Sequence, residues 1–403
     1  MRVLALTHRV PFPPDKGDKI RTFNLLSRLA TRCEVHLAAL AEPPSDVAHA
    51  ARLRRVFASV TLAPLDLRVQ RVRALPALLS STPLTVPVFH SARLEAEVDA
   101  LVRELRPDVI YAESSSMAPY ALRHPRVPLV MDFVDADSAK WSAYAERAGF
   151  PMRFVHRREA RTLAAFERHV AGRAAISVVT AERERELFAA IAPGCDVRAL
   201  PNGVDTAYFA PAAHPAADAS AVFFGAMDYQ ANVEAAEFLV RAVLPKVRVE
   251  HPSFRVVLAG SNPAAAVRVL ADVPGVTVTG FLPDLRDVVR GCAVCAIPLR
   301  VARGVQNKVL EAMAMGVPVV CSPGAAEGVD AEPGVHLAVA SVSDDGTATA
   351  EVIATLLRDR ARAAALAAAA RERVVASHGW EPRAAQLHEL LAEAVRGPAS
   401  ARA

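Results

Sequence analysis

The sequence is poor in aromatic residues. They make up 5% of its 403 positions, whereas hydrophobic residues of all kinds make up 52% and charged residues 22%. A composition this apolar argues against global disorder, and the scarcity of aromatics means that the core is built mainly from alanine, valine and leucine. No apolar run approaches the ~20 residues that cross a bilayer, so we expect no transmembrane helix. The length predicts two or three domains of roughly 150 residues each.

Cysteine is scarce as well. The five cysteines are odd in number and scattered, which argues against the disulfide framework of small secreted domains; they are Cys33, Cys195, Cys292, Cys295 and Cys321. Cys292 and Cys295 have the spacing of zinc ligands but lie in an apolar run without a second ligand pair, so we predict a buried strand and no metal site. The sequence opens on a strand-like run, Val3 to Leu6, instead of a signal segment, and we expect a cytoplasmic protein.

The chain has little net charge. A formal value of +4 is too small to indicate a nucleic-acid partner. The charge is unevenly placed, however, because residues 51–80 hold six arginines and one acid, Asp66, and include the apolar run 74–79. Two interpretations stay open: a basic, apolar surface that rests on anionic lipid headgroups, or a solvated helix face with core residues beneath it. The arginines are Arg52, Arg54, Arg55, Arg68, Arg71 and Arg73.

Short β-rich runs alternate with longer helical patterns along most of the chain, which predicts parallel α/β architecture. The expected strands of the first half are 3–7, 34–40, 60–62, 109–112, 129–133 and 176–180. Those of the second half are 221–225, 255–260, 276–280, 293–298, 317–321 and 336–339. The proline-containing segment 201–220 between them reads as a connection. Two doubly wound domains bind ligands at the carboxyl ends of their strands, which suits a transferase, an epimerase, a phosphorylase or a binding protein.

The strongest local signal lies at residues 298–320, which read as a strand, a glycine-containing turn, a helix, a glycine stop and another strand. Gly304 opens the helix, so free backbone N–H groups there suit an anion. Asn307, Lys308 and Glu311 share one helix face. A cation that meets phosphate and a carboxylate that accepts hydrogen bonds from ribose hydroxyls suit a nucleotide diphosphate. The alternative is a surface ion pair between Lys308 and Glu311.

This segment resembles the nucleotide-binding helix of retaining family-4-type glycosyltransferases with the GT-B fold. Other stretches match that family in order: Pro201-Asn202-Gly203-Val204-Asp205, Phe224-Gly225, 258–263, 280–285 and Ser377-His378-Gly379-Trp380. The resemblance implies two Rossmann-like, doubly wound α/β domains that face a central cleft, and a C-terminal helix that crosses back to the first domain. The expected bounds are 1–205 for an acceptor-binding domain, 206–220 for a linker, 221–380 for a nucleotide-sugar-binding domain and 381–403 for the returning helix.

Residues 7–21 and 131–141 are similar to a subgroup associated with exopolysaccharide and PEP-CTERM sorting loci. In the first stretch a strand ends, a loop with prolines and Gly17 follows, and a helix begins near Asp18. Backbone amides and cations there suit phosphate or the acceptor; the alternative is a proline-rich turn before a solvated helix start. The cations are Lys16, Lys19 and Arg21.

Asp135-Ala136-Asp137 has the spacing of a metal-binding D-x-D, but that motif belongs to a different glycosyltransferase architecture. We expect Asp132 or Asp135 to border the cleft and to contact acceptor or donor hydroxyls, and we favour Asp135. The alternative for either residue is a capping role at the helix that starts near Ser138.

Two positions depart from the family pattern. Arg303 stands where most relatives carry a glutamate, eight positions before Glu311, and Ala226 stands where an arginine usually follows the glycine. We expect Arg303, and with it Arg300, to supply the positive charge that the diphosphate needs. A bolder alternative is that Arg303 pairs with the carboxylate of a uronic-acid donor, because a planar guanidinium suits bidentate binding.

The resemblance implies a metal-independent, retaining transfer of a hexosyl group from a nucleotide-diphosphate sugar to a saccharide or lipid-linked acceptor in exopolysaccharide biosynthesis. No metal or other cofactor and no nucleic acid is expected, and contact with the inner face of the cell membrane is a further expectation. The candidate catalytic residues are Arg303, Lys308 and Asp135. The donor-binding candidates are Gly17, Asn202, Gly225, Arg300, Gly304, Asn307 and Glu311. A nucleotide-sugar 2-epimerase and a non-catalytic scaffold of polysaccharide assembly remain as alternatives.

Overall fold

A computed structural model describes residues 1–14, 17–42, 45–213, 218–300, 302, 305–327, 329–343 and 345–397. The chain divides into two compact units. Unit 1 comprises Met1–Pro201 and Trp380–Ala403, and unit 2 comprises Asn202–Gly379. Unit 2 is therefore inserted, in sequence, between the body of unit 1 and the last helix of unit 1.

Unit 1 is built on a parallel sheet of seven strands in the order β3-β2-β1-β4-β5-β6-β7. Its strands are β1 (Arg2–Thr7), β2 (Glu34–Ala41), β3 (Ser59–Pro64), β4 (Val109–Glu113), β5 (Leu129–Val134), β6 (Ile176–Val179) and β7 (Val197–Ala199). The strand order reverses between β1 and β4, and at such a switch point the loops at the carboxyl ends diverge and leave room for a ligand. Central strands are buried on both faces, which explains their unbroken apolar runs.

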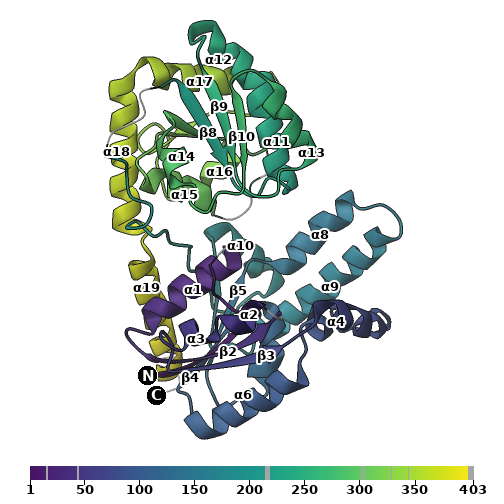
Figure 1. The fold of residues 1–403 in the computed structure, drawn as a ribbon. Helices are drawn as coiled ribbons and strands as arrows, with labels where there is room; N and C mark the ends of the chain where they lie inside the picture. Colours follow the sequence, from purple (N-terminus) through teal and green to yellow (C-terminus); the bar gives the residue numbers. More distant parts are fainter. Residues whose placement is uncertain are drawn as a thin grey trace. The chain divides into compact units, whose positions relative to one another are not determined.

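Helices cover both faces of this sheet (Figure 1). The longer ones are α1 (Gly17–Leu29), α6 (Ala92–Leu105), α8 (Asp137–Arg147), α9 (Met152–Ala171), α10 (Glu182–Ile191) and α19 (Trp380–Arg396). The shorter ones are α2 (Ser45–Ala48), α3 (Ala50–Leu53), α4 (Leu67–Arg73), η1 (Leu75–Leu79), α5 (Thr85–Val88), η2 (Ser115–Met117) and α7 (Ala118–Leu122).

The C-terminal helix α19 packs on α1 and supplies part of the core of unit 1. Trp380, Leu387 and Leu391 are buried together with Leu25 and Leu26 of α1. Two ion pairs hold the same helix at its ends. The first joins Arg28 Nε to Glu381 at 3.2 Å, and the second joins Arg198 to Glu393 at 2.6 Å.

Unit 2 contains a parallel sheet of six strands in the order β10-β9-β8-β11-β12-β13, with its own reversal between β8 and β11. The strands are β8 (Ser220–Phe224), β9 (Arg255–Ala259), β10 (Val276–Gly280), β11 (Val294–Ile297), β12 (Val319–Cys321) and β13 (Ala338–Val339). The helical segments are α11 (Gln230–Phe238), a π-helical η3 (Leu239–Val243), α12 (Leu244–Glu250), α13 (Ala265–Arg268), η4 (Val269–Asp272), α14 (Arg286–Arg290), α15 (Asn307–Ala314), α16 (Pro323–Glu327), α17 (Thr347–Arg358) and α18 (Arg360–Ser377).

The predicted fold class is confirmed: both sheets are parallel and doubly wound. Cys295 lies in β11 and Cys292 lies two residues before that strand; both are buried. Among the described residues no group of three or more histidine, cysteine or acidic side chains is placed to hold a metal ion. In the same part of the chain, no helix has the length and apolar character that a membrane span requires.

Candidate functional site

The switch point of unit 2 brings two glycines into close contact. Gly225 follows β8 with φ of 150°, and Gly260 follows β9 with φ of 147°. A Cβ on Gly260 would lie 1.8 Å from the carbonyl oxygen of Gly225, and a Cβ on Gly225 would lie 2.9 Å from Asn232 Nδ2 and 3.3 Å from Lys308 Nζ. Only glycine allows the two strand ends and the side chains beside them to approach so closely.

Lys308 lies in the first turn of α15, and its ammonium group lies next to Gly225. Its Nζ donates a hydrogen bond of 2.6 Å to Asn232 Oδ1 and lies 4.8 Å from the centre of the Phe223 ring. Asn232 is oriented in turn, because its Nδ2 donates to the carbonyl oxygen of Ala226 at 2.8 Å. Burial lowers the pKa of Lys308 to about 8, so most of the ammonium stays charged at neutral pH. Within the part of the chain that the structure describes, this cation thus has a neutral partner and no carboxylate in contact.

Glu311 follows one turn later on the same helix face. Burial raises the pKa of its carboxyl group to about 7, although the nearby Lys308 opposes the shift. Among the described residues neither a hydrogen bond nor an ion pair occupies this carboxylate, and the surface ion pair with Lys308 that the spacing also allowed is not formed. A desolvated carboxylate with open acceptor positions is suited to bind vicinal hydroxyl groups.

The other donor-side candidates of unit 2 lie near the start of α15 or outside the described residues. Asn202 Nδ2 donates to Asn307 Oδ1 at 3.4 Å, which links the first turn of unit 2 to the start of α15. Arg300 follows β11, and its guanidinium carbon lies 5.8 Å from the centre of the Phe238 ring. Arg303 and Gly304 fall outside the described part of the chain, so their expected roles stay predictions.

The switch point of unit 1 carries a charged cluster that the sequence analysis did not predict. The imidazole of His8 lies between two carboxylates: Nδ1 is 2.8 Å from Glu113 Oε2, and Nε2 is 3.4 Å from Asp18 Oδ2. Arg9 also donates to Asp18 at 2.8 Å. Burial disfavours a charged imidazole, but the carboxylates of Glu113 and Asp18 outweigh it and raise the pKa of His8 to about 9.

Near this cluster, two buried polar atoms have no hydrogen-bond partner among the residues that the structure describes. Glu113 is 2% exposed, yet its Oε1 is unpaired, and the buried hydroxyl group of Ser115 is unpaired as well. Unpaired buried polar atoms are costly, so a polar ligand at this edge would satisfy both. The sequence contains only local indications of this cluster: His8 lies in the motif 7–21, and Glu113 follows the predicted strand 109–112. Their contact joins residues 105 positions apart.

The predicted role of Arg21 in contacting phosphate or acceptor does not agree with its position. Its side chain is 1% exposed, and Nε and Nη2 donate to Asp132 Oδ2 at 3.1 and 2.9 Å. A third bond of 2.8 Å runs to the carbonyl oxygen of Leu200. Tyr111 donates to the same carboxylate oxygen at 2.7 Å. Arg21 and Asp132 therefore form a buried ion pair inside unit 1, which leaves Asp132 away from any ligand.

The other candidates of unit 1 lie at its sheet edge. Lys19 is mostly buried and lies 3.7 Å from Asp46, and Gly17 opens α1 with no atom near its missing side chain. Asp135 follows β5, accepts a hydrogen bond of 2.8 Å from Thr180 and pairs with Lys140 at 2.9 Å. It does not cap α8, whose cap residue is Ala136. Lys16 lies outside the described residues.

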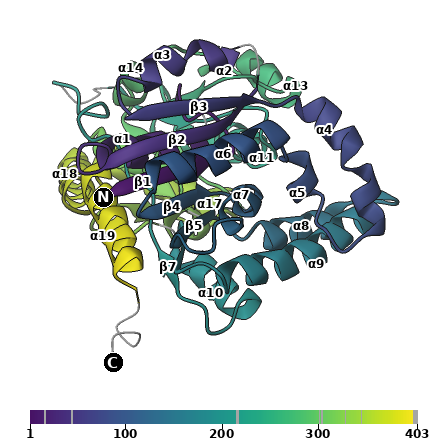
Figure 2. The ribbon, with the colours of Figure 1, turned by 90° about the horizontal axis from the view of Figure 1, so that it is seen from below.

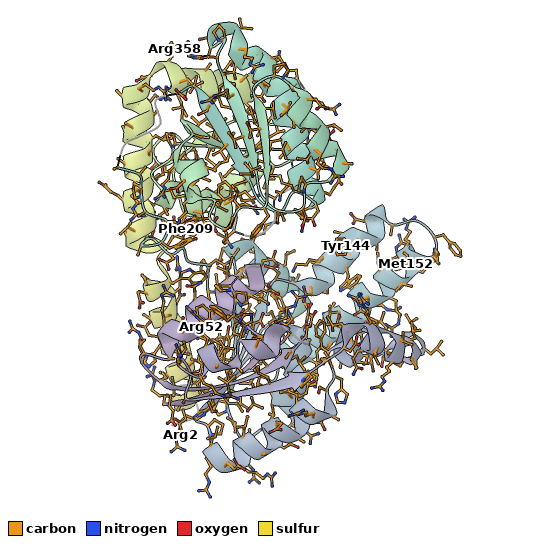
Figure 3. All side chains as sticks on the ribbon, viewed as in Figure 1. Arg2, Arg52, Tyr144, Met152, Phe209 and Arg358 are labelled. Carbon is orange, nitrogen blue, oxygen red and sulfur yellow. The ribbon has the colours of Figure 1, made fainter. Side chains whose placement is uncertain are left out.

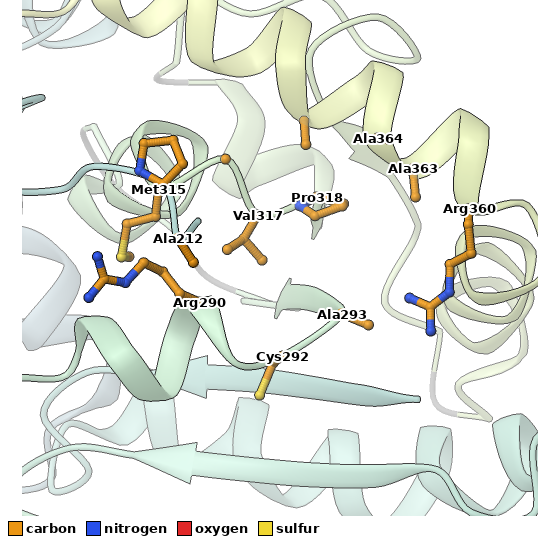
Figure 4. A pocket seen from close by; sticks show the side chains of 13 residues that line it. Ala212, Arg290, Cys292, Ala293, Met315, Val317, Pro318, Arg360, Ala363 and Ala364 are labelled. Carbon is orange, nitrogen blue, oxygen red and sulfur yellow. The ribbon is translucent and has the colours of Figure 1, made fainter. Parts of the chain in front are cut away.

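A cavity of about 500 Å³ in unit 2 lies at the opposite edge of the sheet (Figure 4). Its lining comes from the residues just before β11 and β12 and from α18, with Arg290 and Arg360 on either side. Because Gly225 and the start of α15 lie at the carboxyl ends of the strands, this mainly apolar cavity is separate from the candidate donor site.

Comparison with known proteins identifies the class. Residues 17–208 match the family model described as Glycosyltransferase Family 4, and residues 218–359 match that described as Glycosyl transferases group 1. A relative in Mycobacterium tuberculosis is 31% identical over 321 residues, which cover 73% of this chain and 79% of the relative. The chain belongs to the family-4, group 1 glycosyltransferases and is a glycosyltransferase.

The relative is a GDP-mannose-dependent alpha-(1-6)-phosphatidylinositol monomannoside mannosyltransferase. Among solved structures, that of Alr3699/HepE from Anabaena in complex with UDP is 16% identical, with a TM-score of 0.71 over 97% of this chain and 100% of that one. Sucrose-phosphate synthase from Thermosynechococcus elongatus is 18% identical, with a TM-score of 0.68 over 97% and 98%. These likenesses show that the fold is GT-B.

Proposed function

We propose that the protein transfers a hexosyl group from a nucleotide-diphosphate sugar to a saccharide or lipid-linked saccharide, with retention of anomeric configuration, during exopolysaccharide assembly. The observation that carries the proposal is the arrangement of Gly225, Lys308 and Glu311 at the switch point of unit 2. The Mycobacterium tuberculosis relative uses GDP-mannose and a phosphatidylinositol monomannoside. That specificity makes a mannosyl donor and a glycolipid acceptor the first pair to test.

On the donor side, Glu311 would accept hydrogen bonds from the ribose hydroxyls, and Lys308 would bind the diphosphate together with free N–H groups at the start of α15. The space that Gly225 leaves beside Lys308 Nζ allows phosphate oxygens to approach the backbone. As the glycosidic bond to the diphosphate breaks, negative charge grows on the leaving oxygen. Lys308 would stabilise this charge, and we propose that Arg303 and Arg300 assist it.

We propose that no metal takes part, because the charge on the diphosphate is matched by these cations. The leaving diphosphate would accept the proton of the attacking hydroxyl on the same face of the sugar. The step then forms the new glycosidic bond, breaks the old one and releases the nucleoside diphosphate.

On the acceptor side, the edge of unit 1 offers groups that bind sugar hydroxyls. Glu113 Oε1 and Ser115 Oγ are unpaired, and Asp135 is partly exposed. Burial disfavours ionisation of Asp135, but Lys140 and Thr180 hold the pKa of its carboxyl group below the usual range. We propose that these three residues orient the acceptor. Contact with the inner face of the cell membrane belongs to the same proposal.

The test is nucleotide binding followed by transfer. Thermal unfolding is recorded with UDP, GDP, ADP and dTDP, and a ligand at 100 times its Kd should add about 2.7 kcal/mol to the unfolding free energy. We expect a shift with one nucleotide that Glu311→Ala abolishes and that Glu351→Ala, on the exposed side of α17, leaves unchanged. Sugar transfer to a saccharide acceptor is then measured with the matching donor.

The outcomes separate the alternatives. Conversion of the donor to an epimer without an acceptor would replace the proposal by a 2-epimerase. No shift with any nucleotide would refute the donor site. If Arg303→Glu preserved a preference for a uronic-acid donor, the pairing of Arg303 with a uronate would be wrong.

A further inference from the structure

We propose that two neighbouring segments of unit 1 form one docking surface for an anionic lipid bilayer. The segments are residues 67–82, which contain α4 and η1, and residues 144–158, which contain the end of α8 and the start of α9; together they are called the hairpin surface. The inference deepens the membrane contact of the proposed function. It does not depend on sugar transfer.

Large apolar side chains are concentrated on the hairpin surface. It carries eight of the 17 exposed large apolar residues in the described part of the chain: Val69, Val72, Leu75, Leu79, Tyr144, Phe150, Met152 and Phe154. Leu79 is 95% exposed and Phe150 is 86% exposed. Tyr144 and Met152 lie towards the end of the α8–α9 hairpin, which projects from unit 1 (Figure 3). An apolar concentration of this kind marks an interaction site in a folded protein.

The burial of side chains in the segment 51–80 favours the first of its two interpretations, the basic and apolar surface. Neither α4 nor η1 contains a buried residue. Leu67 at the start of α4 is partly buried against the core of unit 1 and Ala74 between the two helical segments is buried, but Val69, Val72, Leu75 and Leu79 are exposed. Arg52, in contrast, lies 4.7 Å above the ring of Phe12 and belongs to a different part of unit 1. The basic, apolar surface that the sequence predicted at 51–80 thus lies in the second half of that segment, and the α8–α9 hairpin contributes the rest of it.

Hydrogen bonds join the two segments into one surface. Arg158 of α9 donates to the carbonyl oxygens of Leu78, Ser80 and Thr82 at 3.1, 2.7 and 2.8 Å. Phe154 lies one helical turn before Arg158, on the same face of α9, and its ring is 6.1 Å from that of Phe150. The apolar side chains therefore continue from the hairpin end towards Leu79. α4 and the hairpin lie on the same side of unit 1 in both ribbon views (Figures 1 and 2).

The charge of the hairpin surface indicates what kind of partner binds there. Residues 67–82 hold three arginines and no acid, and residues 144–158 hold four arginines and one acid, Glu146. The seven arginines are Arg68, Arg71, Arg73, Arg147, Arg153, Arg157 and Arg158. Aromatic side chains at an interface and arginines near anionic headgroups are the combination that holds peripheral proteins on membranes. The occupant is therefore a bilayer that contains anionic phospholipid.

The experiment is co-sedimentation of the full chain with vesicles of phosphatidylcholine alone, or of phosphatidylcholine with phosphatidylglycerol. We expect binding to the anionic vesicles only, and weaker binding as salt is added. Phe150→Ser with Phe154→Ser should weaken binding roughly tenfold or more, because two apolar side chains no longer enter the interface. Arg71→Glu with Arg153→Glu should weaken it about fivefold or more for each arginine lost.

Two matched variants serve as controls. Arg93→Glu makes the same charge change at an exposed position of α6, and Val249→Ser removes an exposed apolar side chain from α12 of unit 2. Both should bind vesicles like the parent chain. Because all the replaced side chains are exposed, every variant should also keep the parental thermal unfolding and the nucleotide-induced shift. Loss of the nucleotide-induced shift would count against the proposed function. Loss of vesicle binding alone would bear only on the docking surface.

Equal binding to neutral and anionic vesicles, or parental binding by the phenylalanine variant, would overturn the proposal. So would a parent chain that elutes as a dimer without binding vesicles and becomes a monomer after Phe150→Ser. That result would assign the hairpin surface to a second copy of the chain.

Discussion

The charged side chains at the two sheet edges are held in different ways. Lys308 has an amide as its partner and a lowered pKa, whereas His8 lies between two carboxylates and has a raised pKa. An ammonium group without a carboxylate partner keeps its charge available to an incoming phosphate. The His8 charge is balanced by Glu113 and Asp18 before any ligand arrives, so it orders the residues that follow β1.

The raised pKa of His8 predicts a pH-dependent stability. Its pKa is about 9 in the folded chain and about 6.5 when unfolded, so its stabilising contribution is complete below pH 6.5 and is lost as the pH rises through 9. The contribution is at most about 3 kcal/mol. We expect His8→Gln to be less stable than the parent at pH 6 and nearly equal to it above pH 9.

Denaturant unfolding of the parent and of His8→Gln across this pH range gives the difference between their unfolding free energies. The titration of all other groups is removed in this difference. A constant difference from pH 6 to pH 10 would show that His8 does not hold its proton more strongly in the folded state. Loss of nucleotide binding in His8→Gln is not expected, because His8 belongs to unit 1.

The burial of Arg21 leads to a second test at the level of a single residue. Breaking a buried ion pair by removing one partner costs about 3–5 kcal/mol, so Arg21→Met should lower the unfolding free energy by that order. Nucleotide affinity should stay within a factor of two or so of the parent, since the guanidinium of Arg21 is buried inside unit 1, where it donates to Asp132 and to the carbonyl oxygen of Leu200. A stable variant with weakened nucleotide or acceptor binding would restore the phosphate role predicted from sequence.

Local patterns predicted the elements well, because each strand and helix is encoded by its own residues. The expected strand 3–7 corresponds to β1, which spans Arg2–Thr7. The motif at 298–320 predicted a helix opened by Gly304 and followed by a strand; the structure has α15 from Asn307 and then β12, and Gly304 itself lies outside the described residues. The predicted strand 336–339 shrank to two residues, Ala338 and Val339. The π-helical turn at 239–243 had no sequence signal, because it depends on how the helix packs.

The site was less predictable than the elements. Glycines and charged residues at helical spacing marked the surroundings of Gly225, Lys308 and Glu311 locally. The pairs Lys308–Asn232, His8–Glu113 and Arg21–Asp132 join residues 76, 105 and 111 positions apart. Such pairs can be predicted only when the strand order is known. For this reason the sequence did not indicate Glu113 as a site residue, and Arg21 was predicted to contact phosphate or acceptor.

From the contact between α9 and the segment 77–82 we predict how these two elements are held together. Arg158 satisfies several carbonyl groups of that segment, and α4 and η1 bury no side chain of their own. Arg158→Ala should therefore loosen residues 67–82 while the sheet stays intact. We expect amide hydrogen exchange there to quicken by about tenfold or more.

Arg157→Ala is the matched control, because Arg157 is the exposed neighbour on the same helix. It should leave exchange in residues 67–82 at the parental rate. If Arg158→Ala also left that rate unchanged, the segment would be held by contacts other than these hydrogen bonds.

At the scale of the whole molecule, unit 1 is assembled from both ends of the chain. Leu391 of α19 is fully buried in the core that it shares with α1. Leu391→Ala should cost about 2–5 kcal/mol and should lower the stability of unit 1 selectively. Unfolding followed with and without the bound nucleotide distinguishes the units, because the ligand should still protect unit 2.

Val395→Ala, at a half-exposed position of the same helix, should cost far less. Equal effects of the two substitutions would mean that α19 is held by its ion pairs with Arg28 and Arg198 and that its apolar side chains contribute little.

The insertion of unit 2 before α19 has a consequence for biosynthesis. A ribosome releases the chain from its N-terminus, so unit 2 can complete its core while unit 1 still lacks Trp380, Leu387 and Leu391. Until the last helix emerges, the face of α1 that α19 covers is exposed to the cytosol and to chaperones. A chain that stops near residue 379 would carry a complete unit 2 joined to a unit 1 with an open core.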